Sequence, residues 1–477
     1  MDNTFEMVAK TFQGLEQVLA EELRSLGAIN VEPGRRMVSF QGNLETLYRA
    51  NLQCRTALRI LKPFYKFRAT NPDRLYEMVK EFDWGSMLTI DKTFAIDTVT
   101  NSDEFTHSRF VTYRVKDAIV DWFKDRYGED KRPGVRLSDA DIMINVHING
   151  TDVTLSLDSS GESLHKRGYR VAQTEAPINE VLAAGIILMS GWRGDCPLVD
   201  PMCGSGTFLI EAALIAANIN PGIYRRGFAF ERWKDFDADL FDRLYNDDSG
   251  EREVKFKIYG ADISPKAVKI AAENIKSAGV GKYIDLQCRA LSTWEEAPRP
   301  AGVLVTNPPY GERISAPDMD ALYQTIGTKL KRVFTGYHAW IIGYRDEYFA
   351  RIGLAPSQKI PLYNGSLECS LREYIIFEGD RKSFVRGGGK IGHGPAETSR
   401  SERPARRDDR RSPKDRPAPK GRFERKPETA RPVEAESENP LAKRRNPHAL
   451  KMIVGKQPSL KPQEGPLMRS RGWKKKS

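Results

Sequence analysis

Residues 198–212 read as a short apolar strand, a glycine turn and a helix, and this order restricts the fold more than any other segment of the chain. The strand ends at Asp200, the turn carries Gly204 and Gly206, and an alanine- and leucine-rich helix is expected over Thr207–Ile219. Strand, turn and helix in this order form the nucleotide-binding crossover of a doubly wound sheet. We therefore expect an α/β domain with a Rossmann-like sheet that binds its ligand at the carboxyl ends of the strands.

The glycine turn differs from the two common phosphate-binding loops. It reads DPMCGSGT, so it lacks the GxGxxG spacing of dinucleotide sites and the lysine of a P-loop. A glycine turn without a phosphate-binding cation suits a cofactor that is held by its amino-acid and nucleoside ends, and S-adenosylmethionine is such a cofactor. Glycines also occur in tight turns simply because they reach positive φ. The cofactor assignment therefore depends on features further along the chain.

The first of these features is Asp262, at the end of the strand expected over residues 257–261. An acidic residue at this place can accept hydrogen bonds from both ribose hydroxyls of a nucleoside cofactor. The interval from Gly204 is 58 residues, against about 20 in dinucleotide sites, and an insertion over Pro221–Glu253 accounts for most of the excess. In the alternative, Asp262 or Ser264 only caps the helix expected over Lys266–Ala278. We favour the ribose role, because the fold requires an acceptor there.

The insertion begins with arginines and aromatic residues and continues with an acidic stretch. Connections in compact α/β units are usually short. A long connection near a cofactor site predicts a substrate lid, and the alternative is that its aromatic side chains anchor it to the sheet.

The second feature is Asn307-Pro308-Pro309-Tyr310, which follows a strand expected over Gly302–Thr306. Two prolines make a stiff turn, so the neighbouring side chains are held at defined angles. An exocyclic amine of a base is a poor nucleophile, because its lone pair is conjugated with the ring. The Asn307 side-chain oxygen and the Pro308 carbonyl can accept its protons, and the Tyr310 ring can stack on an extruded base. The motif therefore predicts methyl transfer to an exocyclic amine without a metal or a covalent nucleophile.

The region before residue 170 alternates short helices and strands, as in small α+β modules, and contains two basic segments that are candidates for RNA contact. The first, Thr106–Lys116, surrounds two aromatic residues with basic groups, which can bind phosphates while the rings stack on bases. The second, Ser163–Arg170, connects two expected domains. The alternatives are a solvated helix face with Phe110 and Tyr113 in the core, and an ordinary basic linker. The candidate RNA-binding residues are Arg109, Arg114, Lys116, Lys166, Arg167 and Arg170.

Charge is unevenly distributed along the chain. The formal net charge is +11, but residues 386–477 carry 26 Lys and Arg against 11 Asp and Glu, a net charge of +15. The preceding body is therefore at −4 and must bind a polyanion through local patches. The tail is rich in Arg, Pro, Glu and Ser and poor in large apolar residues, so we expect it to be disordered. It is either an RNA-binding tail or only a solubilising appendage.

Composition excludes several other classes of protein. No apolar run is long enough to span a membrane, and the acidic, mixed N-terminus does not resemble a signal peptide. The five cysteines are dispersed and never form a CxxC pair, which argues against both a disulfide framework and a zinc site. We expect a cytoplasmic, reduced, monomeric protein with no metal and no membrane partner.

At this point a family resemblance is evident. The segments LVDPMCGSGTFLIEAALIA, GADIS and NPPYGER, together with SLHKRGYR and APINEVLAA, resemble the THUMP-containing Rossmann-fold methyltransferases of bacterial ribosomal RNA. The likeness is greatest to the large-subunit (23S) rRNA guanine-N2 methyltransferases. It implies a ferredoxin-like part over 1–44, a THUMP RNA-binding domain over 45–157, a class I methyltransferase domain over 158–385 and the disordered basic tail over 386–477.

The resemblance also implies roles for individual residues. Asp200, Gly204 and Gly206 would surround the methionine end of S-adenosylmethionine, and Asp262 its ribose. Asn307, Pro308 and Tyr310 would receive the guanine, with Asn307 also beside the cofactor. The implied activity is methylation of the N2 amine of a guanosine in ribosomal RNA.

Two departures from the family pattern keep other readings open. The acidic residue that commonly follows the third strand is replaced by Cys288-Arg289-Ala290, and the second methyltransferase domain of some relatives is absent. One alternative is a non-catalytic RNA-binding factor in ribosome assembly. The others are amine methylation of tRNA, DNA or a protein glutamine. The sequence does not identify the methylated nucleotide.

Overall fold

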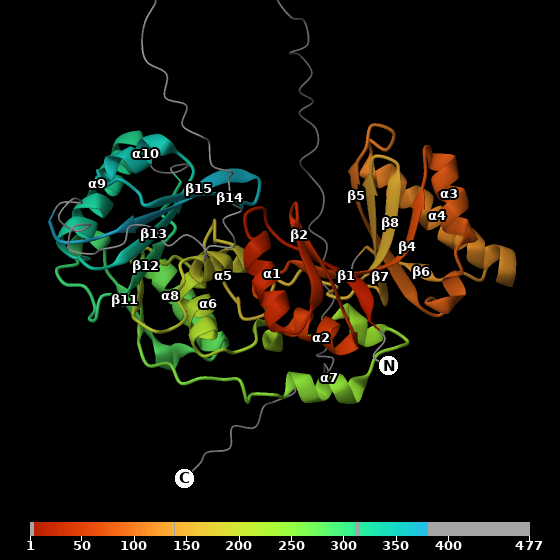
Figure 1. Cartoon of the computed structure of the whole chain (residues 1–477), viewed down its shortest axis with the longest axis horizontal. Helices are drawn as coiled ribbons and strands as arrows, with labels where there is room; N and C mark the ends of the chain where they lie inside the picture. Colours follow the sequence, from red (N-terminus) through yellow and green to blue (C-terminus); the bar gives the residue numbers. More distant parts are fainter. Residues whose placement is uncertain (1–3, 138, 311–314, 380–477) are drawn as a thin grey trace, which may run out of the picture. The chain divides into compact units, whose positions relative to one another are not determined.

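The computed structural model of the chain describes residues 4–137, 139–310 and 315–379, and all of them belong to one compact unit (Figure 1). The expected tail over 386–477 lies outside the described residues. Two sheets, one of eight and one of seven strands, form the framework of this part of the chain. Within it, no helix has both the length and the apolar character that crossing a bilayer would require.

The first module is built from four strands and two helices. Helix α2 begins where Asn43 caps it, because the Asn43 side-chain oxygen accepts a hydrogen bond from the Thr46 N–H at 3.0 Å. The elements of this module are Phe5–Lys10 (β1), Glu16–Ser25 (α1), Ile29–Gly34 (β2), Met37–Gly42 (β3), Leu44–Gln53 (α2) and Arg59–Arg68 (β4).

The second module adds two helices to a further set of strands. Its central hairpin turns at Gly150, whose φ of +59° suits a tight two-residue turn. The elements of this module are Pro72–Glu81 (α3), Thr93–Asn101 (β5), Ser108–Tyr127 (α4), Gly134–Val135 (β6), Ile142–Asn149 (β7) and Asp152–Asp158 (β8).

Strand β4 joins the two modules into one sheet with the order β2-β3-β1-β4-β8-β7-β5-β6. Its first residues pair with β1, as in the register Lys10 opposite Arg59. The remainder pairs with β8 as far as Arg68 opposite Asp152. Because one strand belongs to both modules, backbone hydrogen bonds run from one module into the other without a linker.

The C-terminal domain has a sheet with the order β11-β10-β9-β12-β13-β15-β14. All its neighbours are parallel except β15, which runs antiparallel to β13 and β14. This is a doubly wound sheet with a reversal between β9 and β12, which confirms the expected fold class. Its elements are Glu180–Met189 (α5), Leu198–Asp200 (β9), Thr207–Ala216 (α6), Ala238–Tyr245 (α7), Ile258–Asp262 (β10), Pro265–Ser277 (α8), Ile284–Cys288 (β11), Val303–Thr306 (β12), Ala316–Arg332 (α9), His338–Gly343 (β13), Asp346–Arg351 (α10), Gln358–Asn364 (β14) and Leu367–Ile375 (β15).

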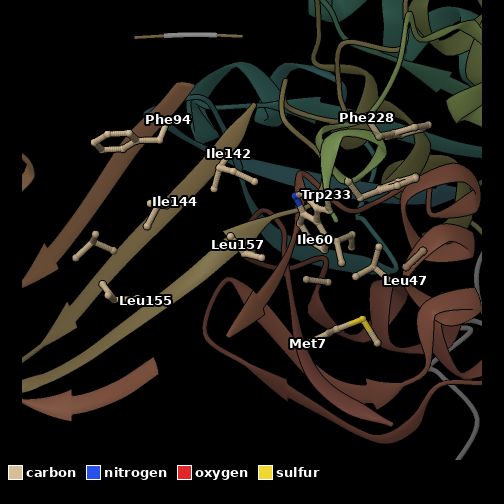
Figure 2. Close-up of a cluster of buried hydrophobic side chains, with 14 of the residues drawn as sticks. Met7, Leu47, Ile60, Phe94, Ile142, Ile144, Leu155, Leu157, Phe228 and Trp233 are labelled. Carbon is tan, nitrogen blue, oxygen red and sulfur yellow. The ribbon is translucent and has the colours of Figure 1, made fainter. Parts of the chain in front are cut away.

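The insertion between α6 and β10 is an anchor, and the expectation of a lid is wrong. We call residues 221–245 the strap; it leaves the C-terminal domain and packs on the first module. The Phe230 ring stacks on Tyr48 of α2, with centroids 4.5 Å apart. Figure 2 shows Trp233 of the strap beside Ile60 of β4, and Phe228 belongs to the same buried cluster.

Polar contacts hold the strap near its beginning and at its middle. Arg225 donates to four backbone carbonyls of the segment that links the domains, those of Ser160, Glu162, Ser163 and Lys166. Lys234 donates to the carbonyls of Gly85 and Ser86 in the second module. The strap therefore connects the C-terminal domain to both N-terminal modules.

Replacing Phe230 by alanine should destabilise the chain by about 3–5 kcal/mol, because it removes a fully buried ring that is stacked on Tyr48. Phe110→Ala is the matched control, since its ring is 52% exposed and should cost no more than about 0.5 kcal/mol. Guanidinium unfolding followed by tryptophan fluorescence measures both changes. Equal losses for the two variants would contradict the anchoring role.

Candidate functional site

Three strand ends bring the predicted site residues to one edge of the C-terminal sheet. Asp200 ends β9, Asp262 ends β10 and Asn307 follows β12. Strand β9 pairs in parallel with β10 on one side and with β12 on the other. Parallel neighbours end at the same edge, and the strand order reverses between β9 and β12, where open α/β sheets bind ligands. The structure thus gathers the residues that the sequence placed on separate strands.

The glycine turn adopts the left-handed backbone for which glycine is suited. Gly204 has φ +53° and Gly206 has φ +80°, and the Gly206 N–H donates to the Cys203 carbonyl at 2.8 Å. A Cβ on Gly206 would lie 3.2 Å from the Cβ of Ala271, whereas at Gly204 the nearest atom would be 3.9 Å away. Gly206 therefore allows close packing on α8, whereas Gly204 is required by its positive φ and not by a close neighbour.

Asp262 holds the glycine turn and does not cap α8. Its carboxylate accepts from the Gly204 N–H and from the Ser264 N–H, both at 2.9 Å. Ser264 is the cap, because its hydroxyl accepts from the Ala267 N–H. Each carboxylate oxygen keeps further acceptor capacity for a ligand hydroxyl.

Asp200 is buried at the base of the site. Its carboxylate accepts from the Met202 N–H at 3.2 Å and from the Thr306 hydroxyl at 2.9 Å. Burial raises the pKa of Asp200 to about 7, and the nearby negative charge of Asp262 adds to the rise. A cationic ligand group would remove much of this penalty, because an opposite charge favours the carboxylate.

Asn307 presents a buried acceptor that nothing in the described part of the chain satisfies. No donor among those residues reaches its side-chain oxygen. An unsatisfied buried acceptor is costly, and at the ligand-binding edge of a sheet a bound ligand can supply the missing donor. Pro308, next to it, is buried, so the turn is firmly packed.

Tyr310 is held by two parts of the C-terminal domain. Its ring meets Tyr344 edge to face, with centroids 5.5 Å apart. Its hydroxyl accepts from the Asn364 side-chain amide at 3.2 Å and lies 3.9 Å from the Cys369 sulfur. Burial raises the pKa of the Tyr310 hydroxyl, so it is a neutral phenol at physiological pH.

Two of the predicted RNA-binding arginines are engaged by contacts within the protein. Arg167 is 2% exposed and donates to Glu211, which is fully buried, and to the Arg55 carbonyl. The prediction for Arg167 is therefore wrong. Arg170 pairs with Glu180 and donates to the hydroxyls of Ser205 and Thr207, so its guanidinium supports the glycine turn instead. Residue charge alone had suggested both assignments.

The other predicted RNA-binding residues lie at the surface. Arg109 is exposed on α4, and Lys166 is exposed beside Glu162. Arg114 pairs with Asp73, and Lys116 with Asp117.

The two aromatic residues of α4 are also exposed. Phe110 is 52% exposed and Tyr113 is 55% exposed, which contradicts the alternative that places both in the core. The Lys116 ammonium lies 6.0 Å from the centre of the Tyr113 ring. Helix α4 therefore shows both rings and basic groups to solvent.

Sequence reasoning missed three residues of the site. Thr306 orients Asp200, and Asn274 of α8 ties the turn to residue 172 through bonds to the carbonyls of Ser205 and Ala172. Tyr344 follows β13 at the same sheet edge. The strand-end rule that located Asn307 could have located Tyr344 as well, whereas buried Thr306 and Asn274 leave no signal in one sequence.

Three family models match successive parts of the chain. They are a ferredoxin-like domain named for RlmL over residues 6–61, a THUMP domain over residues 69–158, and an RMKL-like methyltransferase domain over residues 167–373.

Named relatives extend over most of the chain. "Ribosomal RNA large subunit methyltransferase K/L" of Syntrophotalea carbinolica is 41% identical over 79% of this chain and 54% of its own length. "Putative RNA methyltransferase slr0064" of Synechocystis sp. is 40% identical over 77% of this chain and 96% of its own length. The chain thus spans about half the length of the K/L relatives and nearly all of the Synechocystis protein.

A solved structure has the same fold. The crystal structure of SMU.472, complexed with SAH, is 33% identical and has a TM-score of 0.71 over 80% of this chain and 100% of its own. Given these matches and the strand order of the C-terminal sheet, the chain belongs to the THUMP-containing methyltransferases with an RMKL-like catalytic domain.

Proposed function

We propose that this protein methylates the exocyclic N2 amine of a guanosine in ribosomal RNA, with the large-subunit RNA as substrate. The observation that carries this proposal is the unsatisfied, buried side-chain oxygen of Asn307, three residues before Tyr310. An amine that approaches the ring can donate its proton to that oxygen.

The cofactor is S-adenosylmethionine, and the residues at the sheet edge fit it. A glycine at 204 places no side chain against the methionine part, and among the described residues buried Asp200 has no cationic partner, which an amino group would supply. Asp262 can accept from the ribose hydroxyls while it still holds the Gly204 N–H. Ile263, which is 72% exposed, offers an apolar surface for the adenine where the usual acidic residue is missing. When bound, the cofactor supplies an electrophilic methyl group on a sulfonium.

The residues after β12 prepare the amine. The Asn307 side-chain oxygen accepts a hydrogen bond from one amine N–H and the Pro308 carbonyl accepts one from the other, which localises the nitrogen lone pair. Because these acceptors are on a stiff turn, the nitrogen is oriented before reaction, and orientation supplies much of the rate acceleration in such transfers. Tyr310 remains neutral and provides a face for the base. Cys203 is a buried thiol whose pKa is raised by burial, so it has no nucleophilic part in this chemistry.

The choice of ribosomal RNA and guanine rests on the relatives and on the N-terminal modules. The K/L relatives bear the name of large-subunit ribosomal RNA methyltransferases. Exposed rings and basic groups on α4 suit single-stranded RNA, whose bases stack on aromatic side chains. Mapping of N2-methylguanosine in ribosomal RNA from a strain without the gene tests the proposal. Unchanged ribosomal RNA would overturn it, and loss of methyl groups from tRNA or DNA instead would identify another substrate.

Asn307→Ala should lower kcat at least tenfold, a loss of about 1.4 kcal/mol of transition-state stabilisation. The affinity for S-adenosylmethionine should remain, since the side chain acts on the amine. Asp262→Ala is the converse control, because loss of a charged acceptor should weaken cofactor binding. Calorimetry and transfer of labelled methyl groups measure the two effects. An Asn307→Ala enzyme with near-normal turnover would remove Asn307 from the catalytic role.

Cofactor affinity should depend on pH through Asp200. In the free protein the Asp200 pKa is about 7, and a bound amino group lowers it, so binding below pH 7 releases a proton. The dissociation constant should therefore fall as pH rises from 5.5 and level off near pH 7. Calorimetry across this range measures the profile, and Asp200→Asn should flatten it and weaken binding. A flat wild-type profile would contradict the assignment.

The α4 rings and the basic tail should contribute differently to RNA binding. Replacing both Phe110 and Tyr113 by alanine should weaken binding about equally at low and high salt, because stacking is not screened. Deleting residues 387–477 should weaken binding mainly at low salt and flatten the salt slope, since the tail binds phosphates. Filter binding over a salt series distinguishes them. A tail deletion that moved methylation to another guanosine would show that the tail determines specificity.

A further inference from the structure

A pocket of about 410 Å³ lies beside the aromatic residues of the site, between the β14–β15 hairpin and the segment after β13. Tyr344 is in its lining, and the same ring contacts Tyr310 edge to face. The Tyr344 ring therefore separates the pocket from Tyr310, on which the target base would stack. None of the roles discussed above uses it.

The hairpin register explains why this face is polar. Lys359 pairs with Arg372, Pro361 with Ser370 and Tyr363 with Glu368, so these side chains share one face of the two strands. The opposite face carries Leu362 and Cys369, which are buried in the core.

One wall of the pocket is preformed. The Arg372 guanidinium donates to the Asp346 carboxylate, and it also lies 3.9 Å from the centre of the Phe349 ring. Arg372 is 5% exposed, so this arrangement is fixed by packing. Its charge is already balanced by Asp346 and is not available to a ligand.

Two other charges in the lining are uncommitted. Lys359 and Glu368 are exposed, and no ion pair joins either of them to another residue in the described ranges. A lysine contacts a phosphate, a carboxylate accepts from an exocyclic amino group, and the Tyr344 ring stacks on a base. This combination matches one nucleotide that carries an amino group.

We infer that this pocket binds the nucleotide next to the methylated guanosine in the same RNA strand. The inference rests on the proposed function, because it presupposes that RNA reaches Tyr310. Glu368 reads the amino group of a neighbouring adenine, cytosine or guanine, Lys359 holds its phosphate, and Tyr344 lies between this base and the target base. The pocket thereby makes methylation depend on the sequence around the target.

The test uses the full-length protein and unmodified transcripts of large-subunit ribosomal RNA, with labelled S-adenosylmethionine. Glu368→Gln and Lys359→Ala should each raise KM for RNA about fivefold or more. This fold-change corresponds to the lower end of the free energies found for a single contact to a base edge. The values of kcat and of the cofactor dissociation constant should stay within about twofold. Glu273→Gln and Lys276→Ala on α8 make the same charge changes at exposed positions outside the pocket and should leave KM unchanged.

Transcripts with each base at the two neighbouring positions give a second readout. The wild type should favour adenine, cytosine or guanine over uracil at one of them, and Glu368→Gln should reduce that preference while Lys359→Ala should keep it. Unchanged KM and unchanged preference in the pocket variants would overturn the inference. A wild-type enzyme that transfers no methyl group to any RNA would instead refute the proposed function.

Discussion

The buried guanidinium of Arg167 joins three parts of the molecule at one point. It donates to the Arg55 carbonyl of the first module, to the Leu164 carbonyl of the linking segment, and to Glu211 of α6. The Tyr169 hydroxyl donates to the same Glu211 carboxylate. Breaking a buried pair of this kind leaves an uncompensated charge and costs about 3–5 kcal/mol. Because α6 begins at the glycine turn, the position of the cofactor site depends on a contact with the N-terminal part of the chain.

The topology of the C-terminal sheet explains which residues could be placed at its edge from the sequence. Asp200, Asp262 and Asn307 were located because each follows an apolar strand, and parallel strands end at a common edge. That inference needs only local pattern and topology. Arg167 was misassigned because its neighbours in sequence are exposed and basic, whereas its burial comes from α6, which lies 44 residues further along the chain. A single sequence does not show such a partner.

The α4 segment illustrates a second limit. Its apolar and aromatic residues occur at several helical positions, so the sequence could not say which of them face the sheet. In the structure Val111 and Val115 are buried while Phe110 and Tyr113 are exposed. The strap shows the converse: its aromatic residues were noted, but only the packing on Tyr48 distinguishes an anchor from a lid. The sequence singled out both segments, and tertiary contacts determined which of their side chains are buried.

The strap also has a consequence for how this enzyme could be re-engineered or recombined. The core of the first module is not encoded by one continuous stretch, because residues 221–245 return from the C-terminal domain to complete it. A chimera joined near residue 160 would combine the N-terminal sheet of one parent with the strap of the other. Phe230 of that strap would then pack on a Tyr48 whose neighbours come from a different protein. A viable exchange of the N-terminal modules would therefore have to transfer two separate gene segments together, the one for these modules and the one for residues 221–245.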